Sequence, residues 1–136
     1  MSTEPTPTED RSSGDSECAE SVLVRAWRRL WIDADATGID ELIADHYIRH
    51  TCDGDVTMTP AEYGDHITRI TSHLRGTAVD VAHVTEVDDM IFARFTLRGM
   101  NLTTGTPVSV AWLGQYRTVD GKLAESWTLR QTDAAW

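Results

Sequence analysis

Several features that would assign a protein to a specialised class are scarce in this chain. It has only two cysteines, Cys18 and Cys52, which are too few for a disulfide framework. No apolar run approaches the roughly 18 residues that a transmembrane helix needs. The N-terminus has no basic segment followed by an apolar stretch, so a secretory signal is not expected. We therefore expect a cytoplasmic protein with reduced thiols and no membrane association.

Positive charge is also scarce. The 136 residues include 12 Lys and Arg against 22 Asp and Glu, which gives a formal net charge of −10. Proteins bind nucleic acids and anionic lipids largely through clusters of Lys and Arg, and such clusters are missing here. We therefore expect no nucleic-acid partner. The length suits a single domain with one hydrophobic core.

The first 17 residues, "MSTEPTPTEDRSSGDSE", differ in composition from the rest of the chain. They contain one apolar residue, five carboxylates and one arginine, a net charge of −4. Such a segment cannot bury enough apolar surface to offset the entropy lost on ordering. The composition predicts a disordered acidic tail over residues 1–17 and a folded domain over residues 18–136.

Helical periodicity begins directly after this tail. From Ala19, apolar residues recur at positions 19, 22, 23, 26, 27, 30, 31 and 34, which predicts an amphipathic helix that stops near Gly38. Asp40 resembles the N-cap of a short second helix, "DELIAD". The following "YIRHT" reads as a short extended segment. Two helices and a strand are thus expected before residue 52.

A third helix has the clearest start signal in the chain. Thr59 can serve as the N-cap, Pro60 occupies the first helical position, and Glu62 completes a capping box. Gly76 suits the C-terminal cap. This helix brings the predicted number of N-terminal helices to three.

After Gly76 the period of the pattern changes from helical to two. Alternation predicts strands over residues 77–87, 90–100, 107–119 and 122–132. Asp120-Gly121 is the strongest hairpin signal. Three helices followed by four long strands predict an α+β domain in which one curved antiparallel sheet wraps around the helices. A sheet curved in this way forms a cone whose open end can hold a ligand.

Several segments in this order resemble a known family. "ADATGIDELIADHYIRHT", "TPAEYGDHI", "DDMIFARFTLRG" and "VDGKLAESW" are similar to the nuclear transport factor 2-like superfamily, and within it to the SnoaL-like polyketide cyclase branch. The resemblance covers roughly residues 20–131. It implies a cone-shaped α+β barrel, usually a homodimer, with an apolar pocket. Members use this pocket for cyclisation, isomerisation, epoxide hydrolysis, dehydration or binding without chemistry, so the fold alone does not define the function.

The stretch "DHYIRHTCDGD", residues 45–55, is the densest in reactive side chains. His46, His50 and Cys52 are residue types that bind zinc, but no second cluster of potential ligands accompanies them. Asp53–Asp55 lacks the further ligands of a calcium loop and is better explained as a turn. We predict no metal and no cofactor.

Acid/base chemistry is the sharper hypothesis for this stretch. A histidine titrates near neutral pH and can move a proton to or from a substrate. The resemblance places the position of His50 at the pocket, which favours it over His46, His66, His73 and His83. Tyr47, a candidate ligand contact, should lie on the opposite face of a regular strand. A purely structural role for His50 at a strand end remains open.

The last two strands are expected to supply the other wall of the pocket. If their alternating sets face inward, Trp112, Tyr116 and Trp127 form an aromatic lining suited to a flat ligand. Trp31 lies at the end of the first helix that would reach this cavity. Core packing is an equally good explanation for any single aromatic side chain. The candidate ligand-binding residues are therefore Trp31, Tyr47, Arg94, Trp112, Tyr116 and Trp127.

Glu125 belongs to the same alternating set of the last strand as Trp127. If its carboxylate is buried, it needs a positively charged partner, and Arg94 or Arg130 could supply one. An ion pair is one explanation and a catalytic acid is the other. The resemblance implies an acid beyond the tryptophan of the last strand, where this chain has Gln131, which cannot transfer a proton. The resemblance also implies an Arg-x-Asp pair, which the epoxide hydrolases of the superfamily have. Here Arg94 is followed two positions later by Thr96 in place of the aspartate.

Two hypotheses remain. The first is a cofactor-independent enzyme that acts on a hydrophobic, carbonyl-bearing metabolite, with His50, Glu125 and Gln131 as candidate catalytic residues. The second is a module of the same fold that binds a small molecule or a protein without turnover. Both use an apolar pocket, and the resemblance implies a homodimer in either case.

Overall fold

The computed structural model describes residues 21–136. The predicted acidic tail and the predicted start of the first helix at Ala19 lie outside this range. No helix between residues 21 and 136 is both long enough and apolar enough to cross a membrane.

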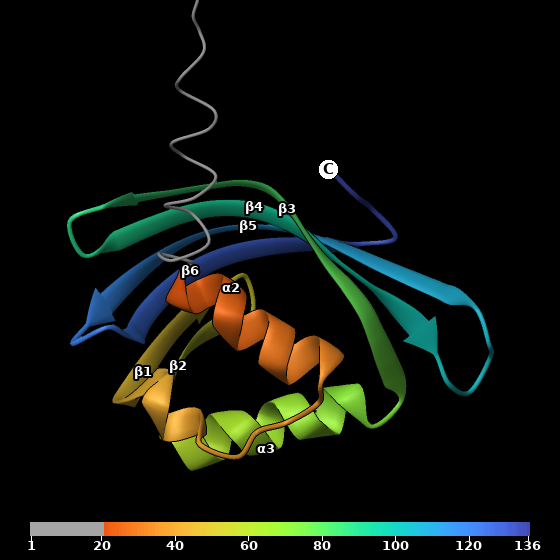
Figure 1. The fold of residues 1–136 in the computed structure, drawn as a ribbon, viewed down its shortest axis with the longest axis horizontal. Helices are drawn as coiled ribbons and strands as arrows, with labels where there is room; N and C mark the ends of the chain where they lie inside the picture. The colour runs from red at the N-terminus through yellow and green to blue at the C-terminus, as the bar shows by residue number, and fades with distance from the viewer. Residues whose placement is uncertain (1–20) are drawn as a thin grey trace, which may run out of the picture.

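Six strands of the described chain form one curved sheet (Figure 1). They are β1 (Ile43–Thr51), β2 (Gly54–Met58), β3 (Leu74–Val87), β4 (Met90–Asn101), β5 (Pro107–Val119) and β6 (Lys122–Thr132), in the spatial order β2-β1-β6-β5-β4-β3. β1 and β6 pair in parallel, whereas the other neighbours in the sheet are antiparallel. The prediction of an all-antiparallel sheet is therefore wrong at this one junction, because β1 returns beside the last strand of the chain.

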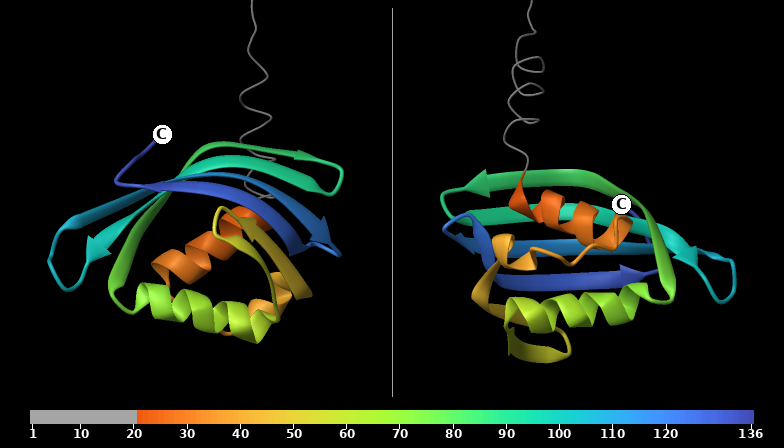
Figure 2. Two further views of the ribbon diagram at one scale, coloured as in Figure 1. Left: turned by 180° about the vertical axis from the view of Figure 1, so that it is seen from behind. Right: turned by 60° about the horizontal axis from the view of Figure 1, so that its bottom comes forward.

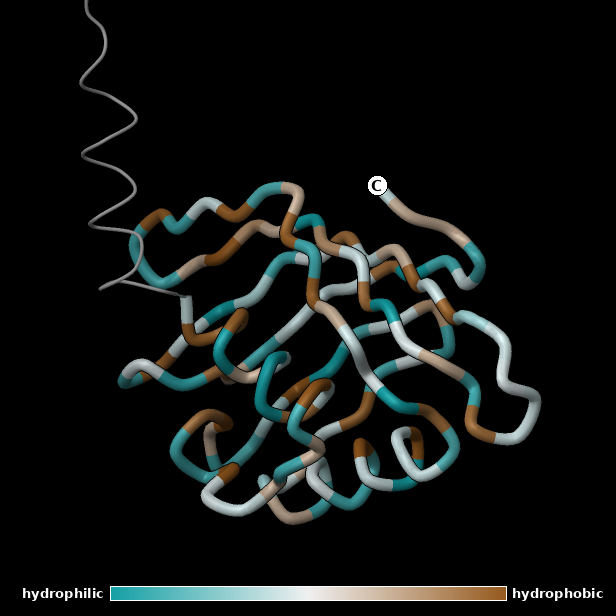
Figure 3. The backbone as a smooth tube through the Cα atoms, turned by 45° about the vertical axis from the view of Figure 1, so that its right-hand side comes forward, coloured by the Kyte–Doolittle hydropathy of each residue, from teal (hydrophilic) through white to brown (hydrophobic). Residues whose placement is uncertain are grey.

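The four long strands predicted after Gly76 are confirmed as β3 to β6. Hydrophobic and hydrophilic residues follow one another at short intervals along the backbone of the sheet (Figure 3). Asp120 and Gly121 both have positive φ, 53° and 75°, as expected for a two-residue hairpin turn. The sequence did not predict β2, because the turn expected at Asp53–Asp55 ends at Gly54, where the chain pairs back on β1.

The first helix is confirmed, with a different end. It consists of α2 (Val22–Trp27), capped by the Ser21 side chain, and a π-helical segment η1 (Arg28–Ile32). Ala34 has a φ of 50°, and the Asp35 N–H donates to the Arg29 carbonyl, 3.0 Å away. This left-handed closure ends the helix before Gly38 is reached.

The predicted second helix is wrong. Only a single 3₁₀ turn, η2 (Ile39–Glu41), forms there, and β1 begins at Ile43. The segment is too short to form a stable helix without tertiary packing. Ile39, Leu42 and Ile43 are all buried in the core, so tertiary packing sets their conformation.

The third helix is confirmed as α3 (Pro60–Thr71). The Thr59 hydroxyl accepts from the Glu62 N–H, and the Glu62 carboxylate accepts from the Thr59 N–H, which completes the capping box. The expected cap at Gly76 is wrong because the helix ends at Thr71 and Gly76 lies inside β3. Two α-helices, rather than three, thus lie within residues 21–136.

Both helices pack on the concave face of the sheet (Figure 2). The core is formed by side chains from α2, η1 and α3 together with inward-facing residues of the strands, including Ile91, Phe95 and Leu97 of β4. No helix within residues 21–136 lies on the opposite face of the sheet. This arrangement leaves two separate surfaces for candidate sites, one inside the curve of the sheet and one outside it.

Candidate functional site

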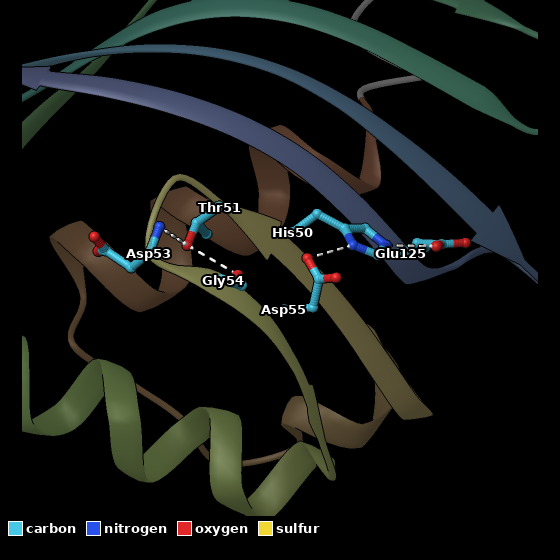
Figure 4. A network of polar contacts seen from close by, with 6 residues as sticks. All are labelled: His50, Thr51, Asp53, Gly54, Asp55 and Glu125. Atoms are coloured by element: carbon cyan, nitrogen blue, oxygen red, sulfur yellow. Dashed lines mark hydrogen bonds and ion pairs between the residues drawn. The ribbon is translucent and has the colours of Figure 1, made fainter.

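His50 lies at the centre of a polar network on the outer face of the sheet, and Figure 4 shows its contacts with Asp55 and Glu125. Its Nδ1 is 2.9 Å from Oδ1 of Asp55 on β2, and its Nε2 is 2.7 Å from Oε2 of Glu125 on β6. Oε1 of Glu125 accepts from Nε of Arg117, 3.1 Å away. The four side chains form a continuous chain of charges across β2, β1, β6 and β5.

The electrostatics of this network favour the charged forms. The hydrogen bond to Glu125, followed by that to Asp55, raises the pKa of His50 above its ordinary value. The hydrogen bond from His50 lowers the pKa of Glu125, and Arg117 lowers it further. Glu125 is therefore an ionised member of an ion pair, with Arg117 as its arginine in place of the predicted Arg94 or Arg130. Both ring nitrogens of His50 are engaged by carboxylates.

A β-bulge determines which face of the sheet these residues occupy. Thr118 pairs with Leu123, but Arg117 pairs with Glu125, so Ala124 is an extra residue in β6. Alternation restarts after the bulge, and Glu125, Trp127 and Gln131 lie on the outer face. The expected inward wall that includes Trp127 is therefore wrong.

Trp127 instead packs against His50 on the outer face. Their rings stack with centroids 5.2 Å apart and an angle of 14° between the planes. With Arg94, Leu113 and Leu129, these two residues line an outer groove of about 610 Å³. Arg94 also lies over the Trp136 ring at 5.1 Å, because the C-terminal residues fold back over the outer face. Gln131 is exposed on this face.

A second cavity, of about 570 Å³, lies inside the curve of the sheet. It lies between the sheet and the helices, with the β1–β2 hairpin at its edge. Apolar and aromatic side chains form most of its walls: Trp27, Trp31, Met58, Tyr63, Ile67, Ile70, Leu74, Leu97, Val108, Val110 and Trp112. Its size and its lining are those of a small-molecule site.

Two of the predicted ligand contacts, Trp31 and Trp112, line this inner cavity. Nε1 of Trp31 donates to the carbonyl of Arg98 at 2.9 Å, which fixes the indole against β4. Trp112 stacks on Phe95, and its Nε1 is buried without a hydrogen-bond partner in the described chain. The ring of Trp27 is 5.6 Å from that of Trp112.

The two predicted tyrosines face inward but lie in the core. Tyr47 is 3% exposed, faces away from His50 as expected, and makes an edge-to-face contact with Tyr63 at 5.1 Å. Tyr116 is 2% exposed, and its hydroxyl has no hydrogen-bond partner within residues 21–136. Burial raises the pKa of both phenols, so they are neutral packing groups.

Arg49, His66 and Arg130, which are not among the site residues predicted from the sequence, line the inner cavity. The guanidinium of Arg49 lies 5.5 Å from the centre of the Tyr63 ring, and that of Arg130 lies 5.8 Å from the Trp112 ring. Burial lowers the pKa of His66, and the positive charges of the nearby arginines lower it further. His66 is thus a neutral imidazole beside cationic groups in an aromatic cavity.

A sequence signal for these residues existed. His66 follows Tyr63 by three positions and precedes Ile67, so it borders the buried stripe of α3. Arg130 lies between Leu129 and Gln131, which belong to the alternating set predicted from the sequence to lie on the inner face. Arg49 likewise precedes His50 in β1 and therefore lies on the opposite face from it. The bulge at Ala124 conceals the inward position of Arg130, because it reverses the faces of the β6 residues that follow it.

The cavity has no evident metal site. Within residues 21–136, no three His, Cys, Asp or Glu side chains converge closely enough to hold an ion. The charged and titratable side chains that line the cavity are His66, Arg49 and Arg130, together with Asp53 and Asp55 of the β1–β2 hairpin.

A curved sheet wrapped around helices, with an aromatic cavity between them, defines an α+β protein of the nuclear transport factor 2-like class. A family model described as the SnoaL-like domain matches residues 24–126, and the chain belongs to this family. The resemblance noted in the sequence is thereby confirmed.

Solved structures agree on the fold. A candidate isomerase from Rhodopseudomonas palustris has a TM-score of 0.71 at 17% identity, over 82% of this chain and 90% of that one. A candidate polyketide cyclase from Acidithiobacillus ferrooxidans has a TM-score of 0.69 at 13% identity, over 81% and 85%. IdmH, a candidate polyketide cyclase from Streptomyces antibioticus, has a TM-score of 0.64 at 18% identity, over 79% and 88%. No curated protein matches the chain.

Proposed function

We propose that this protein is a cofactor-independent enzyme of the cyclase or isomerase type. Its substrate is a hydrophobic, carbonyl-bearing metabolite held in the inner cavity. The observation that carries the proposal is the pairing of neutral His66 with two arginines inside an aromatic cavity of substrate size. The structural neighbours described as cyclases and isomerases are consistent with this chemistry.

The proposed mechanism begins with a flat substrate between the tryptophans. His66, as a neutral base, takes a proton from the carbon next to the carbonyl group. Negative charge then develops on the carbonyl oxygen, and the guanidinium groups of Arg49 and Arg130 stabilise it. In an isomerisation, the proton returns from His66 to a different atom. In a cyclisation, the enolate carbon attacks a second carbonyl group, and the alkoxide formed there takes the proton back from His66.

This proposal moves the proposed base from His50 to His66. Asp55 and Glu125 occupy both ring nitrogens of His50, and the raised pKa favours its protonated form, which is a poor base. Glu125 and Gln131 also lie on the outer face. A catalytic role for these three residues would need a substrate in the outer groove, and it remains a separate prediction.

Proton exchange in heavy water tests the choice of base. We expect the parent protein to accelerate deuterium incorporation next to the carbonyl of 2-tetralone, followed by NMR. A His66→Gln variant should lose about a hundredfold or more of this acceleration, the usual contribution of a general base. The matched control is His50→Gln, which should retain it. Equal loss in both variants, or loss in the control alone, would place the chemistry outside the cavity.

The second candidate is a binding module of the same fold. It is favoured by Gln131, which replaces the acid that the family resemblance implies, and by the outward position of that residue. A protein that binds 2-tetralone, as reported by its tryptophan fluorescence, without accelerating exchange would support this candidate.

A further inference from the structure

We infer that the inner cavity recognises a carboxylate, so that its natural ligand is an unsaturated or aromatic acid whose acid group binds Arg49 and Arg130. Each guanidinium has five N–H donors, so the carbonyl oxygen of the proposed mechanism can share them with the acid group. This inference deepens the proposed function and rests on it only for the location of the ligand. The charges and hydrogen-bonding groups along the cavity wall carry the argument.

Arg49 and Arg130 line the cavity without an anionic partner, unlike Arg98 and Arg117 of the same sheet. Arg98 pairs with Asp80 at 2.6 Å, and Arg117 pairs with Glu125. Within the described chain, neither Arg49 nor Arg130 forms an ion pair or a side-chain hydrogen bond. Each guanidinium instead lies over an aromatic ring that lines the cavity. Their hydrogen-bond donors therefore remain available to a ligand.

The remaining polar groups of the cavity also favour an acceptor-rich ligand. Nε1 of Trp112 is a buried donor without a partner within residues 21–136. Thr132 also contributes a hydroxyl group to the lining, whereas the Thr51 hydroxyl already donates to the Gly54 carbonyl and accepts from the Asp53 N–H. Asp53 and Asp55 supply the carboxylates of the lining, and Asp55 is bonded to His50. Donors thus outnumber free acceptors, although the whole chain is acidic.

A carboxylate satisfies this arrangement better than a neutral polar group does. Guanidinium groups bind carboxylates through parallel, charge-assisted hydrogen bonds, which are about twice as strong as neutral ones. The aromatic walls at Trp27, Trp31 and Trp112 suit a flat ring system. Each arginine lies over an aromatic ring that lines the cavity, Arg49 over Tyr63 and Arg130 over Trp112. The acid group would therefore lie beside the region that binds the flat ring system.

A pair of probes with the same shape and different charge tests the inference. We expect 2-naphthoate to bind the full-length protein about tenfold or more tightly than 2-naphthamide, because a hydrogen bond to a charged group is worth at least this factor. Dissociation constants can be measured by calorimetry and by tryptophan fluorescence. Arg49→Gln and Arg130→Gln should each reduce the preference for the carboxylate severalfold while changing the affinity for 2-naphthamide little.

Arg98→Gln provides the matched control, because it removes an arginine of the same sheet whose charge is already paired. The preference for 2-naphthoate should survive this substitution. Equal or weaker binding of 2-naphthoate relative to 2-naphthamide, including the absence of binding by both, would overturn the inference. A preference that survives both Arg49→Gln and Arg130→Gln would overturn it as well.

The exchange experiment separates this inference from the proposed function. If the charge preference is absent but deuterium exchange into 2-tetralone still depends on His66, only the carboxylate inference fails. If the preference is present and depends on Arg49 and Arg130 while exchange is absent, the enzymatic proposal fails and the cavity is a binding site for acids.

Discussion

Gly76 offers the sharpest test of how the fold positions the cavity. It lies on β3 directly opposite Gly99 of β4, and Trp31 packs against both glycines. A Cβ atom at Gly76 would lie 2.7 Å from the carbonyl carbon and 2.8 Å from Cδ1 of Trp31, and closer still to its carbonyl oxygen. Carbon atoms in contact prefer separations of about 3.5–4.0 Å. In a Gly76→Ala variant, the backbone at Trp31 would therefore have to move by about 1 Å.

The size of the effect follows from two contributions. Overpacking against a backbone group costs about 1–3 kcal/mol. Displacement of Trp31 also weakens the hydrogen bond from its Nε1 to Arg98, which is worth about 1 kcal/mol. We expect the free energy of unfolding to fall by about 2–4 kcal/mol, a large share of the stability of a small domain. Urea unfolding followed by circular dichroism should show the midpoint lowered by about 1–2 M.

Gly64→Ala is the matched control. Gly64 lies inside α3, and a Cβ there would meet Ala36 at 3.5 Å and Ile39 at 3.6 Å, which are ordinary contacts. Because alanine forms helices better than glycine does, the free energy of unfolding of the Gly64→Ala variant should equal that of the parent or exceed it by up to about 1 kcal/mol. A Gly76→Ala midpoint equal to that of the parent would refute the packing argument. Since Trp31 lines the cavity, the Gly76→Ala protein should also bind 2-naphthoate more weakly.

Two further predictions concern the outer face. Contacts with Glu125 and Asp55 raise the pKa of His50, so the stability they contribute is complete below about pH 6.5 and is lost as the pH rises through the folded-state pKa. The stability of the His50→Gln variant, measured by thermal unfolding at several pH values across this range, should not show that loss. A pH dependence of stability parallel to that of the parent would contradict the ion pair. Apolar side chains such as Leu113 and Leu129 are exposed side by side on this face, and we expect a homodimer to bury them. Leu129→Lys should then sediment as a monomer, whereas a monomeric parent would contradict the dimer.

Much of the fold was predictable because its signals are local. The capping box around Thr59 and the Asp120-Gly121 turn depend on neighbouring residues and formed as predicted. The four long strands follow from alternation over 11 to 14 residues. The helix predicted at "DELIAD" failed because its apolar residues are buried in the core in a 3₁₀ turn and the start of a strand.

The site was less predictable because it depends on the faces that residues occupy. One extra residue at Ala124 turns Glu125 and Trp127 outward, away from Trp112. A shift of this kind cannot be read from alternation, because the residues before and after the bulge have the same spacing in the sequence. His50 and Glu125, two of the candidate catalytic residues, lie within hydrogen-bond distance of each other, but on the outer face and not in the inner cavity.

The sequence by itself determined the α+β class, the family and the positions of most strands, because these depend on short-range periodicity and turn chemistry. The tertiary structure decided which histidine lies in the cavity and which arginines have no anionic partner. Those properties depend on strand register, on one bulge and on the parallel return of β1 beside β6, which bring together residues up to about eighty positions apart.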